Sequence, residues 1–457
     1  MNMKTLTDKS TDERIHEVLK KALELVVPSE RERKLAKKVE EEISRRLEDI
    51  LKDYPELEYR FLGSYARDTW LKGELEIDVF ILFPEHYETI DLEKIGLDIG
   101  KKVLDKYEIK YASHPYVHGE VLGANVDVVP CYKLNSPERI KSAVDRTPFH
   151  YEWLKDRIKG KENEVRLLKK FLKVSGLYGA EYKIRGFSGY LCELLIVMYE
   201  NFLNLIKSAV NWTRNLYIDI EKKEVRAKPD LKNIFVADPV DKKRNVAANL
   251  SVDNLAKFVE KCRNFLEDPS LNYFLEEKVV IDYAKIKSEL ESRGTGLYVV
   301  VFNKPDIVED NLYPQLEKAC RKITKFLEKN EFMPIRSGFF ASNYCYLVFE
   351  TMLKTLPKIK KHAGPPFEIV NHAKRFISKK RQYRPFLENG RYYVYVERKY
   401  TNALDAISSF IKHEAEKLGK NVGQELKAGF KILTKSDEIL NLEKDFIEYL
   451  TDFLCIK

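Results

Sequence analysis

Two acidic side chains lie two positions apart in a segment that has the pattern of a buried strand. Glu76 and Asp78 alternate with the aliphatic residues Ile77, Val79 and Ile81. Since residues two apart on a strand point to the same face, we predict that both carboxylates share one face and the aliphatic side chains the other. Like charges this close are unfavourable unless cations lie between them, and carboxylate oxygens suit Mg²⁺.

A third acid has the same setting. Asp127 is flanked by Val126 and Val128 in the run NVDVVP at 125–130. If this strand lies beside the first, three carboxylates meet at one edge of the sheet. Such a trio can hold two divalent ions for phosphoryl transfer, in which one ion activates an attacking 3′-hydroxyl and the other holds the triphosphate and stabilises the leaving pyrophosphate.

A glycine and a serine precede the first pair of acids. Gly63 and Ser64 come before a short helix predicted over 65–71. The glycine lets the backbone approach a phosphate, to which the Ser64 hydroxyl and the first amides of the helix can donate hydrogen bonds. Arg67 can add a positive charge to the same anion. Each motif alone is more often a turn, a cap or a solvent-facing strand, but together with Asp127 they favour a nucleotide site.

These motifs lie in a chain that mixes helical and strand-like segments. Aliphatic residues at helical spacing begin at Ile15 and stop before Pro28, and Ser29 with Glu32 forms a capping box for a second helix. Strand patterns occur within 59–83 and at 123–130, 297–302, 332–341 and 344–350, and helical patterns at 95–107, 162–176, 190–206 and 314–330. This mixture over 457 residues predicts a multidomain α+β protein.

Composition narrows the class of protein. The six cysteines are scattered without a C-x-x-C pair, which argues against a zinc knuckle or a disulfide framework and favours a reducing cytoplasm. The N-terminus is polar and charged, and the most apolar stretch, 191–199, is short and contains Glu193. We therefore expect a cytoplasmic protein without a signal peptide or a membrane span. The oligomeric state stays open, a homodimer included.

Positive charge is concentrated in one segment. The whole chain has a net charge of +8, yet the stretch from Lys354 to Tyr400 alone holds 13 basic and three acidic residues, a net of +10. Aromatic residues are interleaved with these charges, and strand-like alternation predicts that Tyr393 and Tyr395 pack inward. Basic residues can contact phosphates and rings can stack on bases, so we expect RNA to bind here through helix shape more than sequence. The alternative is a solvated basic surface over an aromatic core.

The sequence resembles a known family. Gly-Ser before a short helix, then Glu-x-Asp and a later strand Asp, is the signature of the DNA polymerase beta-like nucleotidyltransferase superfamily. The longer sequence segments around this signature are similar to those of the archaeal, class I CCA-adding enzymes, also called tRNA nucleotidyltransferases. The likeness extends from Gly63 to Glu368 in the segments GSYARDTWLKGELEIDVF, HPYVHGEVLGANVDVVPCYKL, SAVDRTPFHYEWL, NEVRLLKKFLK, GLYGAEYKIRGFSGYLCELLI, DPVDKKRNVAANLS, KPDIVEDNLYPQLEKA and GPPFE.

The resemblance implies an activity and a set of roles. It implies stepwise addition of C, C and A to the 3′ end of tRNA from CTP and ATP, without a nucleic-acid template and with release of pyrophosphate. Glu76, Asp78 and Asp127 would be the catalytic residues and would hold two Mg²⁺ ions. The nucleotide-binding positions carried over from the family are Ser64 and Arg67 at the triphosphate, Thr147, His150, Lys169 and Tyr178 at the phosphates and ribose, and Arg244 at the base.

Arg244 also suits base reading on physical grounds. Its rigid fork of donors can meet the O2 and N3 acceptors of cytosine or, differently, those of adenine. Without the resemblance, ordinary roles would be favoured for four of these residues: solvated charges for Lys169 and Arg244, an interdomain histidine for His150 and a core aromatic for Tyr178.

The chain divides accordingly into three parts. We expect residues 1–150 to form a polymerase beta-like nucleotidyltransferase head with a mixed sheet and helices, 151–275 a mostly helical nucleotide-recognition domain, and 276–457 an α+β body and tail that binds tRNA. Two alternatives stay open. The same site could serve a poly(A)-type or oligoadenylate polymerase, or the scaffold could be a non-catalytic RNA-binding protein, against which the three intact acids stand.

Overall fold

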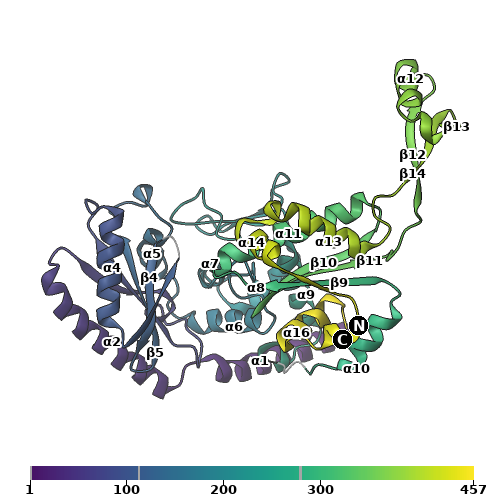
Figure 1. Ribbon diagram of the computed structural model, residues 1–457. Coiled ribbons are helices and arrows are strands. Elements are labelled where there is room, and N and C mark those ends of the chain that lie inside the picture. Colours follow the sequence, from purple (N-terminus) through teal and green to yellow (C-terminus); the bar gives the residue numbers. More distant parts are fainter. Residues whose placement is uncertain (1–2, 112–113, 277–279, 457) are drawn as a thin grey trace. The chain divides into compact units, whose positions relative to one another are not determined.

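The computed structural model (Figure 1) describes residues 3–111, 114–276 and 280–456, and its contacts divide the chain into two units, 1–277 and 278–457. Each unit combines helices with β-sheet. The predicted α+β class is therefore confirmed.

The head of the first unit is built on a five-stranded mixed sheet. Its strand order is β1-β2-β5-β4-β3, in which β2 and β5 run parallel and the other neighbours antiparallel. The strands are β1 (Glu58–Leu62), β2 (Glu76–Phe83), β3 (Lys106–Tyr111), β4 (Pro115–Val121) and β5 (Ala124–Tyr132).

Two helices cover one face of this sheet. Helix α2 (Glu30–Ile50) begins at the predicted capping box, and α4 (Thr89–Val103) follows β2. Their apolar sides share one core with the aliphatic side chains of β2 and β5, among them Val79 and Val128. The residues that alternate with these aliphatic side chains therefore occupy the opposite face. Phe80, Leu82 and Cys131 form a second buried cluster on this face. We call its remaining part, at the start of β2, the open face.

Two helices of the head end earlier than their patterns predict. The helix expected over 65–71 is the single turn α3 (Gly63–Ala66), because Asp68 adopts a positive φ of 49° that no helix continues. The helical pattern at 95–107 runs into β3, since α4 ends at Val103 and the next residues form the edge strand.

The rest of the first unit is mostly helical around one large core. Its helices are α1 (Met3–Val26), α5 (Thr147–Leu154), α6 (Glu162–Lys173), α7 (Gly189–Tyr199), α8 (Phe202–Ala209) and α9 (Val252–Glu267). A small sheet of order β7-β6-β8 packs with them and consists of β6 (Leu216–Asp219), β7 (Glu224–Ala227) and β8 (Phe235–Ala237).

The prediction of one continuous helix over 190–206 is wrong. Glu200 has a positive φ of 72° and ends α7, and the Asn201 side chain then accepts a hydrogen bond from the Asn204 amide to cap α8. Among the described residues, no single helix is long and apolar enough to cross a bilayer, and only α7 and α8 together, bent by 92°, have the length and composition for it.

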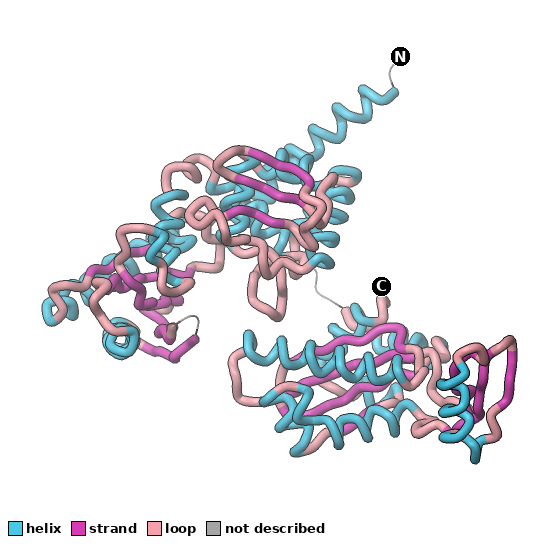
Figure 2. Tube along the Cα trace, turned by 90° about the horizontal axis from the view of Figure 1, so that it is seen from above, coloured by secondary structure: helices cyan, strands magenta, loops and turns pink. Residues whose placement is uncertain are grey.

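The second unit is organised around a four-stranded antiparallel sheet of order β10-β11-β9-β15. Its strands are β9 (Gly296–Asn303), β10 (Pro334–Ala341), β11 (Tyr344–Thr351) and β15 (Lys431–Leu433). Helices accompany the sheet, as Figure 2 shows: α10 (Tyr283–Ser292), α11 (Glu309–Lys329), α13 (Ala403–Glu414), α14 (Lys420–Ala428), α15 (Ser436–Leu440) and α16 (Lys444–Phe453).

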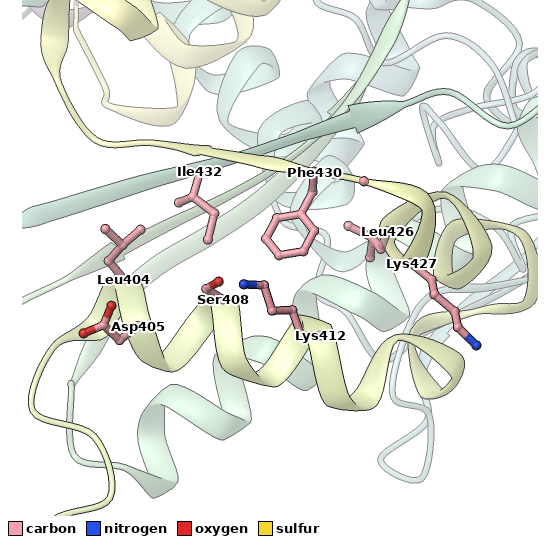
Figure 3. A pocket seen from close by; sticks show the side chains of 9 residues that line it. Leu404, Asp405, Ser408, Lys412, Leu426, Lys427, Phe430 and Ile432 are labelled. Carbon is pink, nitrogen blue, oxygen red and sulfur yellow. The ribbon is translucent and has the colours of Figure 1, made fainter.

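A pocket of about 560 Å³ lies where α13, α14 and β15 meet (Figure 3). Leu404, Phe430 and Ile432 give it apolar walls, and Ser408 and Lys412 point into it from α13. β15 therefore covers α13 incompletely. None of the residues predicted from the sequence to bind nucleotide lines this pocket.

The basic segment forms a structure of its own within the second unit. We call residues 354–400 the basic protrusion. It contains β12 (Ile359–Pro366), α12 (Val370–Lys379), β13 (Phe386–Glu388) and β14 (Arg391–Glu397), whose strands pair in the order β12-β14-β13. Figure 1 shows it extending away from β9, β10 and β11 at the end of two chain segments.

One packing prediction in the basic protrusion is wrong. Tyr395 was expected to point inward, yet 56% of its surface is exposed, and its neighbour Val394 is fully buried instead. The alternation of β14 is therefore shifted by one position, because a small aliphatic residue fills the thin core of this three-stranded sheet.

Candidate active site

The acidic residues predicted from the sequence lie in one row across the head sheet. Asp78 on β2 is the register partner of Asp127 on β5, and His118 on β4 faces Asp127 from the other side. Ile77 and Val126, the residues that precede the two acids, are completely buried in the core. The structure thus brings Glu76, Asp78 and Asp127 together on the open face of the sheet.

The three carboxylates are difficult to ionise together. Burial, reinforced by the charges of Asp127 and Glu76, raises the pKa of Asp78 to about 7. Burial also raises the pKa of Glu76 and of Asp127 above their ordinary values. Mutual repulsion in a partly desolvated cluster disfavours the charged forms, and an added positive charge would reverse this effect.

The donor set fits a divalent cation. Ligand atoms of Glu76, His118 and Asp127 lie within 4.8 Å of one another, and Asp78 stands next to Asp127 in the strand register. Carboxylate oxygens that are short of positive charge are the ligands that Mg²⁺ prefers.

His118 is a member of this cluster that the sequence analysis missed. Its Nδ1 lies 2.5 Å from Oδ1 of Asp127, so a protonated Nδ1 donates a hydrogen bond that orients the carboxylate. A signal was present: the apolar residues Val117 and Val121 of β4 face the core, which puts His118 on the open face.

The Gly-Ser turn packs directly against the acids. Gly63 has a φ of +67°, and a Cβ atom at this position would lie 1.7 Å from Oδ2 of Asp78. Only glycine tolerates both the conformation and this close approach. The turn is fastened by the Thr69 amide, which donates to the Ser64 carbonyl at 2.9 Å. Ser64 is therefore held beside Asp78.

Arg67 and Lys169 belong to a buried polar cluster around Glu193. The Arg67 guanidinium meets both carboxylate oxygens of Glu193 at 3.0 and 3.1 Å through Nε, and Thr69 donates to the same group at 2.6 Å. Lys169 donates to the carbonyl and the hydroxyl of Thr69 at 3.0 and 3.3 Å. The positive charges of Arg67 and Lys169 also act to lower the pKa of Asp78, so they lie close enough to influence the acids.

Tyr178 and Lys169 converge at the start of α7. A Cβ atom on Gly189 would lie 3.0 Å from the Tyr178 hydroxyl and 3.8 Å from Lys169 Nζ. Thr147 lies at the start of α5, half-buried. Of the residues predicted to line the nucleotide, the structure therefore groups Lys169 and Tyr178, while Thr147 stands at a different helix.

His150 and Arg244 meet at a common partner. His150 Nε2 lies 3.0 Å from Oδ2 of Asp238, and Arg244 Nη1 donates to the same oxygen at 2.7 Å. The His150 ring stacks on Tyr190 with 3.9 Å between ring centroids. Two residues predicted separately are thus joined through a buried acid that the sequence analysis did not single out.

Comparisons with known proteins agree along the whole chain. Three family profiles match in order: a nucleotidyltransferase domain at 25–150, the second domain of tRNA nucleotidyltransferase at 163–275, and the C-terminal domain of CCA-adding enzyme at 293–435. A CCA-adding enzyme of Archaeoglobus fulgidus is 54% identical over 97% of this chain and 98% of its own length. The chain belongs to the CCA-adding enzyme family.

Other relatives in the CCA-adding family are more distant. The CCA-adding enzyme of Methanocaldococcus jannaschii is 41% identical over 87% of this chain and 91% of its own, and that of Methanosarcina barkeri 38% identical over 94% and 97%. Among solved structures, a cytoplasmic RNA terminal U-transferase overlaps 58% of this chain and 99% of its own, at 14% identity and a TM-score of 0.44.

Membership in the CCA-adding family places the site in a nucleotidyltransferase. The three acids lie within the part matched by the nucleotidyltransferase profile, and Lys169, Tyr178, Glu193 and Asp238 lie within the second. The site described above is therefore assembled from both regions of the first unit.

Proposed function

We propose that this chain adds C, C and A stepwise to the 3′ end of tRNA, using CTP and ATP, without a nucleic-acid template and with release of pyrophosphate. The observation that carries the proposal is the register of β2 and β5, which sets Asp78 beside Asp127 on the open face of the head of a CCA-adding family member.

Glu76, Asp78 and Asp127 are the proposed catalytic residues, and they would hold two Mg²⁺ ions. Bound Mg²⁺ would supply a lowered pKa for the attacking 3′-hydroxyl and charge stabilisation for the triphosphate and the leaving pyrophosphate. Since His118 occupies Oδ1 of Asp127, we propose that Oδ2 of Asp127 faces the RNA 3′-hydroxyl. Gly63 packs directly against the Asp78 carboxylate and leaves no room for a side chain between them.

The nucleotide would lie between the acids and α7. We propose that Ser64 and Arg67 act on the triphosphate, with Glu193 holding the Arg67 guanidinium in place. Thr147, His150, Lys169 and Tyr178 are proposed to line the phosphates and the ribose. Arg244, whose side chain is 36% exposed, is proposed to read the base with the donors that Asp238 does not use.

The basic protrusion is the proposed contact for the acceptor stem and elbow of tRNA. Lys374, Arg375 and Lys379 on α12 are exposed, and α12 and β12 enclose a pocket of about 390 Å³ lined by Arg375, Phe376 and Lys380. Exposed cations supply phosphate contacts, while the exposed rings of Phe367 and Tyr395 can stack on bases.

The activity is tested by nucleotide incorporation. Purified protein with MgCl₂ and a tRNA that lacks its last three nucleotides is given CTP, ATP or both. We expect two C additions with CTP alone and the complete CCA end with both nucleotides. Homopolymeric A tails without use of CTP would overturn the proposal in favour of a poly(A)-type polymerase, and RNA binding without incorporation would favour a non-catalytic protein.

The RNA contact is tested separately by its dependence on salt. Replacing Lys374, Arg375 and Lys379 by alanine should weaken tRNA binding and flatten the slope of log affinity against log salt by about 2, since each lost phosphate contact removes roughly 0.7 to 0.9 from the slope. The matched control replaces Lys34, Lys37 and Lys38, three exposed cations of α2. An unchanged slope in the α12 variant would contradict this part of the proposal.

Two further expectations stay predictions. A cytoplasmic location and a homodimer are compatible with the proposed substrate, and light scattering of the purified protein will decide the second.

A further inference from the structure

Asp238 is the centre of a buried hydrogen-bond network in the first unit. It directly follows β8 and has no exposed surface. Its Oδ2 faces His150 Nε2 at 3.0 Å and accepts from Arg244 Nη1 at 2.7 Å. Its Oδ1 accepts from the Tyr190 hydroxyl and the Val240 amide, both at 3.0 Å. One carboxylate thus joins α5, α7 and the loop at 238–244.

This carboxylate is charged at neutral pH. Although burial acts to raise it, the hydrogen bond and charge of His150, the Val240 amide and Arg244 together hold the pKa of Asp238 at about 2. A buried carboxylate is stable in this form because its lone pairs are satisfied and a cation stands against it. The contact with Arg244 is therefore an ion pair with directional hydrogen bonding.

The backbone that bears Arg244 is also fixed. The Asp238 amide donates to the Arg244 carbonyl at 3.1 Å, and the Arg244 amide donates to the Asp241 carbonyl at 2.8 Å. The next residue, Asn245, accepts from the Val236 and Ala247 amides and donates to the Ile234 carbonyl. Since the loop is closed at both ends, the remaining freedom of Arg244 lies in its side chain, and Asp238 restrains it.

We propose that Asp238 is a positioning residue that sets the orientation of the Arg244 fork and thereby the choice of base. Asp238 is fully buried and cannot itself touch a nucleotide, so it acts through Arg244. It binds Nη1, so that Nε and Nη2 of the fork stay available for a base. The inference rests on the proposed role of Arg244 in base reading and adds the group that gives that role its geometry.

The test is discrimination among nucleotides in Asp238→Asn. Dissociation constants of CTP, ATP and UTP are measured by calorimetry without turnover, and kcat and KM on tRNA that lacks its terminus. Hydrogen bonds to charged groups contribute enough that we expect the preference for CTP over UTP to fall by about 10-fold or more. The loss should appear in KM and in the dissociation constants, with kcat changed by less than about 3-fold, because the carboxylates of the head are untouched.

A matched control and a double variant separate positioning from general damage. Asp219→Asn makes the same substitution at the end of β6, where Asp219 is the register partner of Ala237, and should leave discrimination unchanged. The double variant with Asp238→Asn and Arg244→Ala should discriminate among nucleotides as well as Arg244→Ala alone, because both substitutions remove the same function. Additive losses, or full discrimination in a folded Asp238→Asn protein, would overturn the inference.

The inference can still be tested if Asp238→Asn does not fold or if the wild-type protein adds no nucleotides. If Asp238→Asn does not fold, Tyr190→Phe removes one hydrogen bond to Asp238 and should weaken the preference for CTP by about 2- to 10-fold. No change in that variant would overturn the inference. If the wild-type protein prefers CTP in calorimetry but adds no nucleotides, the proposed function fails while Asp238 is still tested by binding.

Discussion

The first unit contains two groups of acids that behave in opposite ways. Glu76, Asp78 and Asp127 stand side by side on the open face of the head sheet. Burial raises the pKa of each, and repulsion from a neighbouring carboxylate adds to this effect at Glu76 and Asp78. Glu193 and Asp238 are more deeply buried, yet hydrogen bonds and neighbouring positive charge hold the pKa of both below its ordinary value.

The difference lies in what the protein provides to each group. Arg67 and Lys169 surround Glu193, and Arg244 with His150 meets Asp238. Among the described residues, His118 contacts Asp127, and the positive charges of Arg67, Lys169 and Lys110 act on the three acids of the head without overcoming the effect of burial. Acids that the fold neutralises have a structural or positioning task, whereas acids that it leaves short of positive charge are suited to bind cations.

The largest effect is expected from Asp127→Asn. Removing one carboxylate from the head should lower incorporation by at least about 1,000-fold, since metal ions contribute several kcal/mol of charge stabilisation. tRNA affinity, measured by filter binding, should stay within about 2-fold because phosphate contacts made elsewhere are kept. Glu58→Gln, an exposed acid of β1 in the same sheet, is the control. Full activity in Asp127→Asn would place the catalytic site elsewhere.

Glu193→Gln should have its main effect on stability. The change leaves the Arg67 guanidinium buried beside Lys169 without a negative partner, and breaking a buried pair costs about 3–5 kcal/mol. Urea unfolding measures this loss. Glu17→Gln, which removes an exposed pair with Lys21, should leave the free energy of unfolding nearly unchanged, because solvent screens such a pair. Equal losses of stability in the two variants would show that Glu193 is not stabilised by Arg67 and Lys169.

Asp238 should contribute to stability in acid. Its pKa is about 2 in the folded protein and 3.8 ordinarily, so the folded state gives up this proton more readily than the unfolded state. The contribution, about 2 kcal/mol, is present above pH 4 and lost as the pH falls to about 2. Between pH 5 and pH 2.5, the wild-type free energy of unfolding should therefore fall by about that much more than that of Asp238→Asn. If the free energies of unfolding of the two proteins fall in parallel with pH, Asp238 is not held in its charged form by the fold.

The smallest effect is a stabilisation of the wild type by Mg²⁺. At a concentration about five times the dissociation constant, binding adds about 1 kcal/mol, which raises the Tm by roughly 2–4 °C for a unit of this size. Asp127→Asn should show little of this shift, and KCl at equal ionic strength none. A similar shift in both proteins would mean that the ion binds away from the acids.

The sequence predicts the acidic residues of the site better than it predicts the buried residues that hold the site together. Alternation alone places Glu76, Asp78 and Asp127 on strand faces, and the family signature supplies the adjacency that periodicity cannot give. Glu193 contacts Arg67, which is 126 residues away in the sequence, and Asp238 contacts His150, which is 88 residues away. No local sequence pattern predicts such contacts. Sequence reasoning therefore found the residues suited to chemistry and missed those that hold them.

The errors in the fold have local causes. The helical pattern at 190–206 is continuous in apolar content, and the break at Glu200 depends on a positive φ that no residue preference predicts there. Tyr395 is exposed because Val394 faces the core of the basic protrusion, where alternation alone could not fix which set of residues faces inward.

The basic protrusion leaves and rejoins the second unit at almost the same point. The Leu356 amide donates to the Thr401 carbonyl at 2.8 Å, and the Ala403 amide to the Lys354 carbonyl at 3.0 Å. A short turn could therefore close the chain across this gap, and β9, β10 and β11 would keep their pairing. Under the proposed function, excision of the basic protrusion would yield a smaller protein that keeps the catalytic site and loses the proposed contact with the acceptor stem and elbow, so that short RNA substrates and whole tRNA would be used equally well.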